Sequence, residues 1–105
     1  MPYFALFYQK LVDGYPEKRA AYREEHLTLA KEFFSRGELV LAGALANPMD
    51  GALLIFRGPD ASVVERFVAR DPYVRNGLIK RWQIREWTVV VGNTPEPPAP
   101  AGKSS

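Results

Sequence analysis

The chain of 105 residues contains no cysteine and only one histidine, His26. Without cysteine there can be no disulfide, no thiolate nucleophile and no cysteine-ligated zinc or iron–sulfur centre. The absence of cysteine also fits a reducing compartment. With a single imidazole available, any proton transfer by histidine near neutral pH must use His26.

The chain also has little net charge and no long hydrophobic run. Fourteen basic residues against twelve acidic ones leave a net charge of +2, too small a surplus for a protein that binds nucleic acid by neutralising phosphates. No apolar run approaches the 18 residues of a membrane span, and residues 1–10 lack the features of a signal peptide. We therefore predict a cytoplasmic protein that binds neither nucleic acid nor membrane.

The sequence carries no cofactor motif. It has no phosphate-binding glycine loop, no dinucleotide fingerprint and no group of residues with metal-ligand spacing. The segment 51–57, predicted to be a strand, lacks the paired aromatic residues with which RNA-recognition motifs stack bases. We expect neither a metal nor an organic cofactor.

The residue pattern predicts alternating strands and helices in the order βαββαβ. Aromatic and β-branched runs indicate strands, helix formers bounded by proline and glycine indicate helices, and the turn at 47–51 predicts a hairpin. The expected elements are strands at 3–11, 38–45, 52–57 and 80–91, and helices at 17–36 and from Asp60 or Ser62 to Arg70. This order is that of an α+β ferredoxin-like sandwich, a four-stranded sheet with two helices on one face.

We predict one domain, residues 2–91, followed by a disordered tail at 92–105. The tail holds four of the nine prolines and almost no large apolar side chain. Its role stays open.

Both faces of the predicted sheet are apolar. In the first strand, alternation places Tyr3, Ala5, Phe7 and Leu11 on one side and Phe4, Leu6 and Tyr8 on the other. In the second strand, Leu39, Leu41 and Leu45 lie opposite Val40, Ala42 and Ala44. In the third strand, Leu54 and Phe56 lie opposite Leu53 and Ile55. Two helices cover only one face, so a second copy packed sheet to sheet is expected to cover the other, giving a homodimer. The alternative is that the tail or long loops lie across this face. Assembly beyond a dimer stays open.

His26 and Asp71 are the candidate chemical groups. His26 falls on the apolar stripe of its helix, which also contains Tyr22, Leu29, Ala30, Phe33 and Phe34, so it points toward the sheet. Asp71 stands where Pro72 ends the second helix. Both helices lie on one sheet face, so the carboxylate can orient the imidazole as in general acid–base sites. The alternatives are a core histidine with one hydrogen bond and an ordinary Asp-Pro turn.

Basic residues dominate residues 66–85. Against Asp71 alone this segment has Arg66, Arg70, Arg75, Lys80, Arg81 and Arg85. Such a surplus suits an anionic small molecule, although a solvated charged face is the alternative.

Three motifs together resemble the YCII-related (YciI-like) family. They are Glu17-Lys18-Arg19-x-x-x-Arg23-x-x-His26-Leu27, Gly37-Glu38-Leu39-Val40-Leu41-Ala42-Gly43 and Asp71-Pro72-Tyr73-Val74-x-x-Gly77. The resemblance implies a dimeric α+β barrel, in which ferredoxin-like subunits pair through their sheets. It also implies a site at the shared histidine and aspartate, here His26 and Asp71. Ala44 stands where the family often has a proline.

The resemblance favours a small cofactor-independent enzyme. In this hypothesis His26 is the general acid–base, Asp71 is its partner, and Arg23 and Tyr73 contact the substrate. One member type of the family is a dehydrochlorinase and related barrels include isomerases, which implies elimination or isomerisation on a small aromatic or anionic compound. Two alternatives are a non-catalytic ligand-binding or accessory dimer, and a structural dimer whose His26–Asp71 pair serves only the fold.

Overall fold

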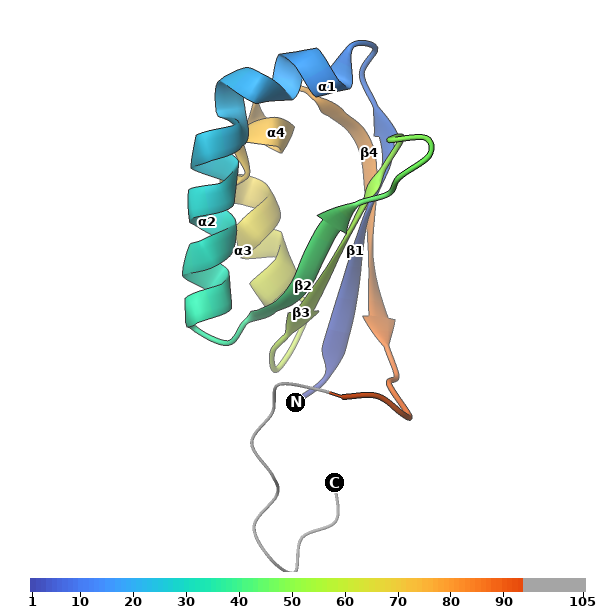
Figure 1. The fold of residues 1–105 in the computed structure, drawn as a ribbon. Coiled ribbons are helices and arrows are strands. Elements are labelled where there is room, and N and C mark those ends of the chain that lie inside the picture. The colour runs from blue at the N-terminus through green and yellow to red at the C-terminus, as the bar shows by residue number, and fades with distance from the viewer. Residues whose placement is uncertain (94–105) are drawn as a thin grey trace, which may run out of the picture.

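The computed structural model describes residues 1–93 (Figure 1). The elements are β1 (Tyr3–Leu11), α1 (Tyr15–Lys18), the 3₁₀ helix η1 (Arg19–Tyr22), α2 (Arg23–Ser35), β2 (Leu39–Ala44), β3 (Ala52–Arg57), α3 (Ser62–Arg70), α4 (Pro72–Arg75) and β4 (Ile79–Trp87). They form one sheet in the order β2-β3-β1-β4, with the helices on one face. The predicted ferredoxin-like fold is confirmed. Residues 94–105 of the predicted tail lie outside the described residues, and the domain boundary at 91 stays a prediction.

The central strand β1 holds the sheet together. It pairs antiparallel with β3, where Phe4 lies opposite Phe56, and with β4, where Phe4 lies opposite Glu86. The strands β2 and β3 form the predicted antiparallel hairpin. β4 ends at Trp87 and not at residue 91, and Val90 and Val91 beyond it are exposed.

The predicted helix at 17–36 is interrupted. It begins at Tyr15 after Gly14, whose φ of 72° lies in the left-handed region that glycine favours. It then tightens into η1. The last residue of η1, Tyr22, has non-helical backbone angles (φ −117°, ψ 1°), and α2 begins after it. Figure 1 shows α1 lying across the end of the sheet at an angle to α2. This bend brings residues of α1, η1 and α2 around one cavity.

The main core lies between the helices and the sheet. Three fully buried rings, Phe33 of α2, Phe56 of β3 and Phe67 of α3, meet at steep angles with centroids 5.2–6.3 Å apart. Such edge-to-face packing is a preferred arrangement of aromatic rings. Phe34, which we expected on the inward stripe, is 63% exposed. It follows the buried Phe33, and one further residue turns its side chain away from the sheet.

The opposite face of the sheet is apolar over β1, β2 and β3, as predicted, whereas β4 adds Gln83 and Arg85 to it. Its buried residues are Tyr3, Ala5 and Ile55, and Phe7, Val40, Leu53 and Val89 pack against them. Several expected side assignments are wrong. Leu11 packs with the helix-side core. In β2, Leu41 does not share the side of Leu39, whereas Ala42 and Ala44 do share it, because the register shifts near Leu11 and Leu41 interrupt the alternation.

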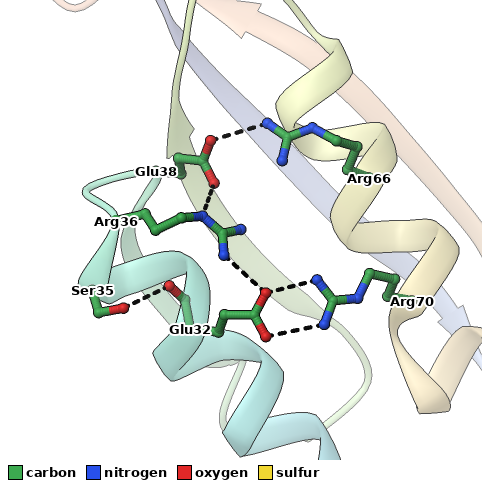
Figure 2. Close-up of polar contacts among 6 residues, drawn as sticks. All are labelled: Glu32, Ser35, Arg36, Glu38, Arg66 and Arg70. Carbon is green, nitrogen blue, oxygen red and sulfur yellow. Dashed lines mark hydrogen bonds and ion pairs between the residues drawn. The ribbon is translucent and has the colours of Figure 1, made fainter.

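An ionic cluster ties the end of α2 to α3 (Figure 2). Glu32 binds Arg36 at 2.8 Å and Arg70 at 2.7 Å, while Glu38 binds Arg36 at 2.9 Å and Arg66 at 3.0 Å. Hydrogen bonds from Arg70 and Arg36 hold the pKa of Glu32 at about 2. The arginines of α3 are thus occupied by carboxylates, which favours the solvated-face interpretation of the basic segment.

Candidate active site

Asp71 connects α3 to α4 and is fully buried. Pro72 forces it into an extended conformation (φ −67°, ψ 118°), which ends α3. Its Oδ1 accepts a hydrogen bond at 3.0 Å from the backbone N–H of Tyr73, so the same side chain caps α4. Asp71 is the one buried residue with an ionisable acidic or basic side chain of the Asp, Glu, Lys, Arg or His type among the described residues. A buried carboxylate is costly unless it is well paired, so its partners matter.

His26 is the first of those partners, as predicted. Its Nδ1 lies 2.8 Å from Oδ1 of Asp71, and its side chain is 14% exposed. A carboxylate that accepts from several donors requires Nδ1 to carry the proton. In the neutral imidazole, the other ring nitrogen, Nε2, carries the lone pair that can accept a proton or a hydrogen bond from a ligand. This is the orienter–base arrangement of general acid–base sites.

Tyr73 fixes the plane of the imidazole. The two rings stack with centroids 3.9 Å apart and an interplanar angle of 9°, and the edge of Phe67 approaches from another side at 6.2 Å. Burial raises the pKa of Tyr73, and the positive charges of Arg19 and Arg23 act in the opposite direction. The histidine is thus held by one hydrogen bond and two aromatic contacts.

Tyr8 was missed by the sequence analysis as a site residue. Its hydroxyl, carried on the central strand, donates a 2.5 Å hydrogen bond to Oδ2 of Asp71. Burial and the charge of Asp71 raise the pKa of Tyr8 well above its usual range, which keeps it a neutral donor. One signal was present: Tyr8 shares the helix-facing side of its strand with Phe4 and Leu6, and a hydroxyl there needs a partner.

The site opens into a cavity of about 310 Å³ between α1, η1 and α2 on one side and β2 and β3 on the other. His26, Arg23 and Tyr73 line it as predicted, and Asp71 lies behind the imidazole. Tyr8, Tyr15 and Arg19 also line it and were not foreseen. None of the six basic residues of 66–85 is among the lining residues, so that segment does not supply the charge of the site.

The part of the wall formed by β2 is made of small residues. Ala42, Gly43 and Ala44 of β2 and Ala52 and Leu54 of β3 line the cavity. Ala44, the position where the family often has proline, is therefore part of this wall. Side chains from the helices supply every polar or charged lining group except the Tyr8 hydroxyl.

No group of three or more histidine, cysteine, aspartate or glutamate side chains within residues 1–93 could hold a metal ion. None of the helices in this range has the length and apolar character needed to cross a membrane.

Comparison with known proteins identifies both a family and a fold. The model of the YCII-related domain matches residues 1–88. A solved structure, 5-chloro-2-hydroxyhydroquinone dehydrochlorinase from Burkholderia phenoliruptrix AC1100 in complex with 2,5-dihydroxybenzoquinone, superposes with a TM-score of 0.69 at 20% identity. The match covers 82% of this chain and 93% of that one. No curated protein matches. The chain therefore belongs to the YCII-related family.

Proposed function

We propose that this protein is a small enzyme that transfers protons without a cofactor, with His26 as the general acid–base. The observation that carries the proposal is the hydrogen-bonded chain from Tyr8 through Asp71 to His26, which ends at a cavity. The buried carboxylate orients the imidazole and stabilises its protonated form during turnover. Arg23 and Tyr73 contact the substrate in the same cavity.

The reaction we propose is elimination or isomerisation on a small aromatic or anionic compound. Nε2 of His26 removes a proton from the substrate. In elimination a leaving group such as chloride then departs with its bonding electron pair, and in isomerisation the proton returns at another carbon. The dehydrochlorinase among the structural neighbours supports the elimination. At 20% sequence identity, that likeness is one of fold. Neither reaction requires a redox partner.

The first experiment measures chloride release from 5-chloro-2-hydroxyhydroquinone as the probe, with the wild type and His26→Gln. One general acid–base group contributes about 10²–10⁴-fold to the rate. We expect His26→Gln to lose at least a hundredfold in kcat while its circular dichroism and gel-filtration profile stay unchanged. Glu25→Gln is the matched control, because Glu25 is exposed on the same helix and is not a lining residue.

The outcomes separate the three hypotheses. Equal rates for His26→Gln and the wild type would contradict the catalytic role of the imidazole. Binding of the probe without turnover by the wild type would favour the non-catalytic ligand-binding protein. Neither binding nor turnover, with a lower melting temperature for His26→Gln, would favour a purely structural dimer.

We also propose that the protein is a homodimer formed through the second face of the sheet. That face carries the cluster of Tyr3, Ala5 and Ile55, and Figure 1 shows no helix covering it. The Tyr3 hydroxyl is buried and makes no hydrogen bond among the described residues. Covering an apolar sheet face by a symmetric copy is a common solution, and it is the arrangement that the resemblance to dimeric α+β barrels implies.

Light scattering coupled to gel filtration tests the dimer. The measured mass of the wild type should be twice the chain mass of 11.8 kDa. Phe7→Glu places a charge among the residues of the second face and should give a monomer. Phe34→Glu, on the exposed side of α2, should leave the dimer intact. A wild type that elutes as a monomer, or a dimeric Phe7→Glu, would contradict this interface.

A further inference from the structure

Among residues 1–93, two arginines of the cavity have no acidic partner. Arg19 of η1 and Arg23 of α2 both line it, and no carboxylate within residues 1–93 lies at ion-pairing distance from either one. Arg36, Arg66 and Arg70, by contrast, are all bound to glutamates. Like charges four positions apart on a helical segment repel each other. A bound anion would relieve that repulsion.

The two arginines share the cavity with aromatic rings. Arg19 sits over the ring of Tyr15 at 5.7 Å, and Arg23 lines the cavity together with Tyr73. The rings of Tyr15 and Tyr73 meet edge to face at 5.9 Å, and Tyr73 in turn stacks on His26. A planar ligand can therefore contact aromatic surface while its charged end meets the arginines.

The cavity limits the size of that ligand. Its volume of about 310 Å³ is at the lower end of the range of small-molecule sites, about 300–1,000 Å³. A closed cavity of about 150 Å³ already holds benzene. One ring with a few substituents fits this space, whereas two linked rings would extend into solvent.

We infer that the cavity binds a single-ring organic anion, a carboxylate or an ionised ring hydroxyl, whose charge is held by Arg19 and Arg23. This inference rests on the proposed function in placing the ligand within reach of His26, and it adds Arg19 as a specificity-determining residue. The anionic oxygen accepts hydrogen bonds from the two guanidinium groups, and the ring lies between the tyrosines and the wall of small residues on β2. No cationic ligand of the same shape should bind.

Isothermal titration calorimetry with matched probes tests the inference. The probes are 4-hydroxybenzoate, its neutral isostere 4-hydroxybenzamide, and 2,5-dihydroxybenzoquinone, whose hydroxyl groups ionise readily. We expect at least one anion to bind ten times or more tightly than the amide. Arg19→Gln and Arg23→Gln should each weaken anion binding by about 10- to 100-fold, the usual effect of losing a hydrogen bond to a charged group. Tighter binding of 4-hydroxybenzoate would identify a carboxylate as the preferred charged group. Tighter binding of 2,5-dihydroxybenzoquinone would identify an ionised hydroxyl.

Two further variants serve as controls. Lys31→Gln removes the same charge from an exposed position of α2 that does not line the cavity, so it should bind as the wild type does. Ala42→Leu fills the cavity from the strand side and should weaken all probes alike. Equal affinity for anion and amide, no binding of any probe, or equal losses in Lys31→Gln and Arg23→Gln would overturn the inference.

The binding and catalytic proposals can fail separately. His26→Gln should still bind the anions, since its loss leaves both guanidinium groups in place. Selective anion binding without turnover would reject only the catalytic role. Turnover that is unchanged in Arg19→Gln and Arg23→Gln would reject only the anion anchors.

Discussion

Replacement of Asp71 by alanine is expected to lower the free energy of unfolding by about 3–5 kcal/mol, the cost of breaking a buried charge pair. The carboxylate accepts from Nδ1 of His26, the hydroxyl of Tyr8 and the backbone N–H of Tyr73. Asp71→Ala leaves all three donors without this acceptor, two of them in a buried setting. Urea denaturation followed by circular dichroism measures the change.

Asp60→Ala is the matched control for this prediction. Asp60 also accepts a backbone hydrogen bond near a helix start, from the N–H of Ser62 at 2.9 Å, but it is exposed. Water can replace its oxygen, so its loss should change stability far less than the loss of Asp71. Similar destabilisation by the two substitutions would show that the buried network contributes little to stability. Asp71→Asn should fall between them, because it keeps one acceptor oxygen.

The second large effect is expected at two neighbouring phenylalanines. Phe33 is fully buried and its ring meets Phe56 and Phe67, whereas Phe34 is 63% exposed. Phe33→Ala should cost about 3–5 kcal/mol, because it removes apolar contacts and leaves a cavity. Phe34→Ala should stay within about 0.5 kcal/mol of the wild type. The two substitutions remove the same atoms from adjacent positions, so only burial differs.

Urea midpoints and slopes from the same denaturation experiment decide between these expectations. Equal midpoints for the two variants would mean that the aromatic cluster is not the centre of the core. A large effect of Phe34→Ala alone would mean that its exposed ring is covered in the native assembly.

Local patterns were sufficient to predict most of the fold. Alternating side chains identified the strands, and the glycine and proline signals around residues 47–51 identified the hairpin. The inward position of His26 and the end of α3 before Pro72 also follow from spacing and sterics between near neighbours. The corrections concern interruptions in regular structure: the bend at Tyr22 and the register shifts near Leu11 and Leu41.

The site was predicted only in part. His26, Asp71, Arg23 and Tyr73 came from one inward stripe, one helix end and a family resemblance, and they lie together. Tyr8 is 63 positions from Asp71 in the sequence. The side-chain periodicity of one strand or helix cannot indicate a contact between residues so far apart. The basic residues of 66–85 were the visible charge cluster, yet the cavity is lined by arginines of the first helical segment.

By itself, then, the sequence determined the order of strands and helices, most of the residues that face inward, and that proton chemistry by an imidazole can rest only on His26. These properties depend on local sterics, side-chain periodicity and composition. Only the tertiary structure decided that Tyr8, Asp71 and His26 form one hydrogen-bonded chain, and that the bend after η1 directs Arg19 and Arg23 to the same cavity. Those contacts join distant segments, and their geometry depends on how the helices pack on the sheet.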